Sequence, residues 1–136
     1  NESSSSTINK INVDSNYFKK KQKFLYGSEV SKYYKEFIVK QITLDNYLEL
    51  KSIDKVDFIK IDTEGYEYFV LLGAEQYLKE FKYIIFEHHY DDMIQKKYKF
   101  SQMSKILKEN GFQQMLKLKM PLRKTFEYIY FNKKVL

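Results

Sequence analysis

The sequence predicts an α/β fold in which parallel strands alternate with helices and an antiparallel β-hairpin ends the chain. Two short apolar runs are separated by a helical pattern: Val56–Ile61, which carries the charged residues Asp57 and Lys60 inside it, and Tyr83–Phe86. Continuous apolar runs of this length are typical of parallel strands that are covered on both faces. Two further strand segments follow near the only proline. This order indicates the second half of a doubly wound sheet, finished by an antiparallel edge pair.

Length and composition fit one domain over residues 1–136. The chain is 43% hydrophobic, and 136 residues lie in the usual size range of a domain. We expect residues 1–36 to form loops and short helices, because a polar, Ser-rich start precedes a stretch without clear periodicity. The α/β portion is expected over residues 37–136. Because residue 1 is Asn rather than Met, we expect only a partial domain.

The α/β portion is predicted to begin with a strand over Phe37–Ile42. Thr43 can cap a short helix over Leu44–Leu50, because its hydroxyl can accept a hydrogen bond from a free backbone amide. The strand Val56–Ile61 follows and ends at an acidic turn that contains Gly65. Gly65 is expected to support this turn.

A helix is predicted from about Tyr66 to Glu80. Apolar residues recur there at steps of three and four, which marks a face that packs on a sheet. We expect Thr63 or Glu64 to cap the helix. Gly73 would lie inside it, where a close approach to the sheet would explain a glycine.

After the strand Tyr83–Phe86, a helix is predicted over Ser101–Asn110. Gly111 is its expected C-terminal signal. The segments Gln113–Lys119 and Thr125–Asn132 then form the predicted β-hairpin.

Charge and composition limit the possible partners. The net charge is +6, but the basic residues are nearly all lysines and Arg123 is the only arginine. Since Arg is the usual reader of bases and phosphates, we expect no nucleic acid partner. The chain has no Cys, which fits a reducing, cytoplasmic setting, and no apolar run approaches the roughly 20 residues of a membrane span. The oligomeric state stays open.

Charged side chains gather where the two apolar strands end. Asp62 and Glu64 follow the first strand, and Glu87, His88 and His89 follow the second. Ligands of open α/β sheets bind beyond the carboxyl ends of the strands. The predicted catalytic residues are therefore Asp62, Glu64, Glu87 and His88. Because side chains alternate along a strand, at most one of the two histidines faces this site.

Lys60 is predicted to support the site. It shares a strand face with Asp62, and a lysine in a buried strand is costly unless it is paired. We expect Asp62, Glu64 or Glu87 to hold it. Alternatively, Asp62 and Glu64 only cap the following helix. A metal site from the carboxylates and one histidine is conceivable, but the spacing matches no metal motif and no metal is predicted.

Several segments resemble the FkbM-type methyltransferase family. They are Ile42–Asp45, Val56–Glu67, Val70–Ala74 and Ile85–Glu87, and the resemblance covers the chain from about Phe37 to the end. It implies a Rossmann-like, S-adenosylmethionine-dependent methyltransferase, usually an O-methyltransferase that acts on sugars or small natural products. Members carry an N-terminal half with a glycine-rich cofactor loop, and these 136 residues contain no such loop. The chain looks like the C-terminal half, which we expect to be inactive alone.

The resemblance also implies roles for the predicted site. Asp62 and Glu64 fall near the reacting methyl group and the acceptor, and Glu87 and His88 fall on the acceptor side. The implied ligands are S-adenosylmethionine and a small-molecule or glycan acceptor. Methyl transfer to a hydroxyl usually needs a base, which Asp62, Glu64 or His88 could supply.

Two other functions fit the same residues. The chain could be a non-catalytic remnant or interaction module that binds a partner through its basic, Tyr-rich surface. It could also be a metal-assisted hydrolase that uses the two carboxylate clusters.

Overall fold

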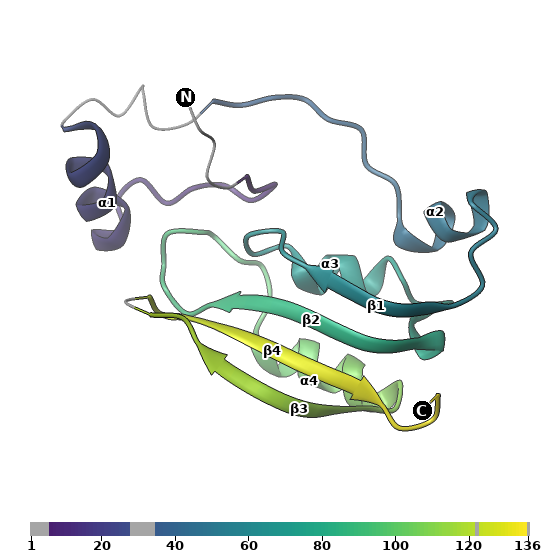
Figure 1. Ribbon diagram of the computed structural model, residues 1–136. Coiled ribbons are helices and arrows are strands. Elements are labelled where there is room, and N and C mark those ends of the chain that lie inside the picture. The colour runs from purple at the N-terminus through teal and green to yellow at the C-terminus, as the bar shows by residue number, and fades with distance from the viewer. Residues whose placement is uncertain (1–5, 28–34, 122, 136) are drawn as a thin grey trace.

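Four strands form one mixed sheet in the order β1-β2-β4-β3 (Figure 1). They span Val56–Ile61 (β1), Phe81–His89 (β2), Phe112–Lys119 (β3) and Thr125–Asn132 (β4). β1 pairs in parallel with β2, and β4 pairs antiparallel with both β2 and β3. The structure is a computed structural model that describes residues 6–27, 35–121 and 123–135. The predicted mixed α/β class is confirmed.

Two helices, α3 (Glu67–Leu72) and α4 (Phe100–Glu109), lie on the same face of the sheet (Figure 1). The chain moves across the sheet in one direction from β1 through β2 to β3, so right-handed crossovers place both helices on one side. The core beneath them includes Ile61, Leu71, Ile84, Phe86, Met103, Leu107 and Tyr128.

The opposite face of the sheet keeps exposed apolar side chains. Phe58, Leu116 and Leu118 are between 44% and 56% exposed there. No helix of the described residues covers these three side chains. The prediction that the parallel strands are covered on both faces is therefore wrong for this part of the chain.

The helix predicted from Tyr66 to Glu80 is shorter than expected. α3 ends at Leu72, Gly73 is its C-cap, and a 3-10 turn, η2 (Leu78–Glu80), follows. The cause is a long-range contact: Asp45 accepts hydrogen bonds from the backbone amides of Gln76 and Tyr77 at 3.1 and 3.3 Å. These amides can no longer continue the helix. Gly73 does meet a close neighbour, but it is the start of the helix α2 (Leu44–Leu50) rather than the sheet.

The strand predicted over Phe37–Ile42 does not form. Residues 35–43 are neither helix nor strand, and Phe37 and Val39 are 80% and 66% exposed. Among the described residues this segment finds no neighbouring strand, so β1 is the edge of the sheet. The next helix, α2 (Leu44–Leu50), has the predicted bounds, and the hydroxyl of Thr43 caps it.

The N-terminal segment is more ordered than predicted. Residues 1–5 and 28–34 lie outside the described residues, but Ile11 bridges to Ile94 and the amide of Asn12 donates to the Met93 carbonyl at 2.7 Å. A helix, α1 (Asn16–Tyr26), follows and buries Phe18 completely. These contacts hold α1 near the carboxyl ends of β1 and β2 (Figure 1).

Candidate active site at the carboxyl ends of β1 and β2

The turn after β1 is built around the buried carboxyl group of Glu67. Its Oε1 accepts hydrogen bonds from the amide of Gly65 at 2.8 Å and from the amide and hydroxyl of Thr63 at 3.3 and 3.2 Å. Its Oε2 accepts a 2.6 Å hydrogen bond from the hydroxyl of Tyr98. One side chain at the start of α3 therefore fixes the backbone of the turn.

The expected helix cap is absent in this turn. The N-cap residue of α3 is Tyr66, and no side chain caps the helix there. The prediction that Thr63 or Glu64 caps α3 is therefore wrong. The carboxyl group of Glu64 makes a different contact, with β2.

The turn requires a glycine at position 65. Gly65 has a φ of +94°, and an added Cβ would lie 2.8 Å from Cγ2 of Ile94. Glu64 also lies in the left-handed region, with a φ of 50°, which is uncommon for a non-glycine residue. The hydroxyl of Thr7 donates to the carbonyl of Glu64 at 2.7 Å. The N-terminal segment thus helps to hold the conformation that directs Glu64 toward β2.

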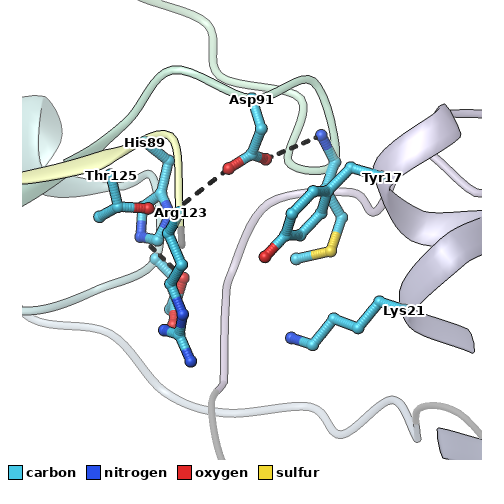
Figure 2. Close-up of a pocket in the computed structure, with 8 residues that line it drawn as sticks. Tyr17, Lys21, His89, Asp91, Arg123 and Thr125 are labelled. Carbon is cyan, nitrogen blue, oxygen red and sulfur yellow. Dashed lines mark hydrogen bonds and ion pairs between the residues drawn. The ribbon is translucent and has the colours of Figure 1, made fainter. Parts of the chain in front are cut away.

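His89 is the charged centre of the site (Figure 2). Its Nε2 lies 3.0 Å from Oε2 of Glu64, and the two side chains form an ion pair. Its Nδ1 lies 3.0 Å from the hydroxyl of Thr125 and 3.8 Å from Oδ2 of Asp91. Burial alone would lower the pKa of His89, but Asp91 and Glu64 outweigh it and raise this pKa to about 9. The ring is therefore an imidazolium at pH 7.

Glu87 lies on the same sheet face as His89, and its Oε2 is 4.0 Å from Nε2 of His89. Glu87 is buried, and burial together with the charge of Asp62 raises the pKa of its carboxyl group. Among the described residues, no hydrogen bond occupies this carboxyl group. It is thus a carboxyl group with an increased affinity for protons.

Asp62 and Lys60 form the predicted ion pair, with 3.3 Å between Nζ of Lys60 and Oδ2 of Asp62. The argument that led to it was wrong, because the Lys60 side chain is 47% exposed. The ammonium group of Lys60 reaches solvent at this edge strand, so its charge needs no compensating partner. The contact orients Asp62 rather than compensating a buried charge.

His88 lies on the other face of β2. Its ring packs among those of Tyr90, Tyr98 and Phe100 at centroid distances of 4.7 to 5.9 Å. Burial lowers the pKa of His88 to about 4, and its Nδ1 has no hydrogen-bond partner among the described residues. The expectation that His88 stands beside the carboxylates is wrong, because β2 continues through His89 and the side chains keep alternating.

Sequence reasoning missed three residues of the site. His89 could be identified only as one of two alternatives, because the predicted strand ended at Phe86 and the alternation of side chains was not followed to His89. Glu67 ends the family-like segment Val56–Glu67, but nothing in the sequence indicated that its side chain is buried. Asp91 lies just beyond β2 and approaches His89 only because the chain turns back there.

The metal alternative has no ligand set in the described part of the chain. No three side chains of His, Cys, Asp or Glu come together there in a way that could hold a metal ion. Within the same residues, every helix is too short or too polar to cross a membrane.

Comparison with known proteins gives one match. The family model described as the methyltransferase FkbM domain matches residues 1–113. This range includes α1 and the N-terminal segment, whereas the sequence resemblance began at about Phe37, and it leaves β4 outside. Neither a curated protein nor a solved structure matches the chain. Because the matched residues make up most of the 136, the chain belongs to the FkbM methyltransferase family.

Proposed function

We propose that this chain is the acceptor-side part of an S-adenosylmethionine-dependent methyltransferase that methylates a hydroxyl group of a sugar or small natural product. The main support is the meeting of three carboxyl groups at the carboxyl ends of β1 and β2 in a chain of a methyltransferase family. Those of Asp62, Glu64 and Glu87 all lie on the open face of the sheet. Ligands of such sheets bind at this end of the strands.

Glu87 is the residue we propose as the base that removes the proton of the acceptor hydroxyl. Its raised pKa favours proton uptake, and no hydrogen bond occupies it among the described residues. Glu64 is engaged by His89, and Asp62 by Lys60. His89 already carries a proton, and His88 is buried on the opposite face. We propose that Glu64 and Asp62, which these contacts hold in place, supply negative charge around the reacting centre.

The described residues suit part of the cofactor. S-adenosylmethionine, when bound, supplies the methyl group from a positively charged sulfonium, and neighbouring carboxylates suit that charge. The 136 residues contain no glycine-rich turn that could hold its nucleotide part. The outer edge of β1 pairs with no described strand, and further parallel strands of a doubly wound sheet would be added there. We therefore propose that a cofactor-binding half precedes this chain in the working enzyme.

The coding sequence upstream of Asn1 is the first test. A predicted strand followed by a glycine-rich turn would support the proposal. A start codon with unrelated sequence would favour a non-catalytic interaction module, for which the exposed apolar sheet face offers a surface.

The second test uses the longer polypeptide, an isotopically labelled methyl donor and a panel of sugar acceptors. Glu87→Gln should lower the rate of methyl transfer by roughly 10² to 10⁴-fold, the usual contribution of a general base. Glu109→Gln, an exposed site on α4, is the matched control. Equal activity of the two variants would refute the role of Glu87.

A further inference from the structure

A small cavity lies beside His89, between α1 and the turn that joins β3 to β4 (Figure 2). Its volume is about 50 Å³. Since one water-sized group needs about 10–15 Å³ by this measure, the cavity holds roughly four such groups. That space fits a carboxylate or a phosphate group and is too small for a whole sugar ring.

The lining of the cavity contains two cations that form no ion pair with a described residue. Glu64 and Asp91 are balanced in part by His89, which lies between them. Lys21 and Arg123 form no ion pair with any described residue, although both help His89 to lower the pKa of Glu64 through space. Figure 2 shows the ammonium group of Lys21 and the guanidinium group of Arg123 on either side of the same space. Together with His89 they outnumber the two carboxylates of the lining, Glu64 and Asp91, so the cavity carries a net positive charge that favours a negatively charged group.

We propose that Lys21 and Arg123 bind a carboxylate or phosphate group carried by the acceptor, a statement that rests on the function proposed above. The guanidinium group can hold two oxygens of such a group at once, and the ammonium group adds a point charge. The hydroxyl of Tyr17, which faces the same space, can donate a further hydrogen bond (Figure 2). The acceptor is then an acidic sugar or a sugar phosphate rather than a neutral sugar.

The anion site depends on the position of α1. Lys21 comes from α1 and Arg123 from the turn before β4, so the anion site forms only when the N-terminal segment is docked. The family match likewise includes this segment. An acidic acceptor would therefore be held between two elements that lie far apart in the sequence.

The test is a binding experiment on the 136-residue chain with three probes: D-glucuronate, glucose 1-phosphate and glucose. Backbone amide NMR shifts measure each dissociation constant at low and at high salt. We expect the two charged probes to bind and glucose not to bind, and binding to weaken as salt rises. The variant Lys21→Gln/Arg123→Gln should weaken binding at least tenfold.

The matched control is Lys23→Gln/Lys124→Gln. It also removes two positive charges, but from exposed positions that do not line the cavity. Equal weakening by both double variants, or equal binding of glucose, would overturn the anion site. Preference for one charged probe distinguishes a carboxylate from a phosphate.

Failure of this inference differs from failure of the proposed function. Binding of charged probes that depends on Lys21 and Arg123, without methyl transfer by the longer polypeptide, would leave the anion site standing and refute the enzyme. Methyl transfer to a neutral sugar at the same rate in the wild type and in the Lys21→Gln/Arg123→Gln variant would support the enzyme and refute the anion site.

Discussion

The hydroxyl of Tyr98 donates a 2.6 Å hydrogen bond to Oε2 of Glu67, and both side chains are buried. Tyr98 follows β2 and Glu67 begins α3, so this bond joins the two segments that flank the site. The other carboxyl oxygen of Glu67, Oε1, accepts hydrogen bonds from the turn that carries Glu64. The geometry of Glu64 and His89 thus depends on a carboxyl group that does not itself reach the cavity.

Replacing Glu67 should destabilise the whole chain. Glu67→Ala leaves the buried Tyr98 hydroxyl and the Gly65 amide without their acceptor, and we expect a loss of about 3 kcal/mol in the free energy of unfolding. Urea denaturation measures it. Glu75→Ala, at an exposed position, should change the stability by less than about 0.5 kcal/mol. A loss below about 1 kcal/mol for Glu67→Ala would mean that the turn holds without this residue.

Stability should fall as the pH rises from 6.5 to 9. The pKa of His89 is raised to about 9 in the folded chain, so its contribution is complete below the unfolded value of about 6.5 and is lost as the imidazolium deprotonates. We expect a loss on the order of 2 kcal/mol after allowance for solvent screening. The pKa values of Glu64 and Asp91 are lowered, so their contributions are lost in acid instead.

Urea denaturation at pH 6.5 and pH 9.5 tests this dependence. His89→Gln should remove most of the difference between the two pH values. A decline of the same size in the wild type and in His89→Gln would assign it to other groups.

Lys60→Met should affect methyl transfer more than folding. The Lys60–Asp62 ion pair is half exposed, so its loss should change the free energy of unfolding by less than about 1 kcal/mol. Asp62 loses its orientation, and we expect the longer polypeptide to transfer methyl groups several-fold more slowly. Lys82→Met is the control, because Lys82 pairs with Asp57 at the far end of β1. If both fold and activity are unchanged in Lys60→Met, this lysine has no supporting role.

The 136 residues alone should not bind S-adenosylmethionine measurably. The three carboxyl groups offer charge to its sulfonium but no backbone cradle for its nucleotide part. Titration calorimetry is the direct measurement, with the longer polypeptide as the positive control. Micromolar affinity of the short chain would show that the described residues hold the cofactor by themselves.

The sequence alone predicted those parts of the fold that depend on local patterns of residues. The Thr43 cap and the amphipathic helix α4 follow from neighbouring residues, and α2 has the predicted bounds. The gathering of Asp62, Glu64 and Glu87 was predictable because carboxyl ends of parallel strands meet at one edge.

Long-range contacts account for the errors. Asp45 ends α3 early from 31 residues away, and no periodicity within the helix could reveal it. His88 and His89 could not be told apart, because the predicted strand ended at Phe86 and β2 reaches His89 only through its pairing with β4. The predicted strand Phe37–Ile42 has strand composition, but a strand also needs a neighbour, which the described residues do not supply.

The outer edge of β1 should cause the 136-residue chain to associate with itself. β1 pairs only with β2 among the described strands, and Phe58 on it is 56% exposed. An apolar, unpaired edge favours pairing with another strand, and a charged side chain there opposes it. Phe58→Lys should therefore shift the chain toward monomers in analytical ultracentrifugation. Leu50→Lys adds the same charge at a 75% exposed site on α2 and should leave the association unchanged. If Leu50→Lys disperses the chain equally, or if the wild type is already monomeric, the edge of β1 is not the surface that associates.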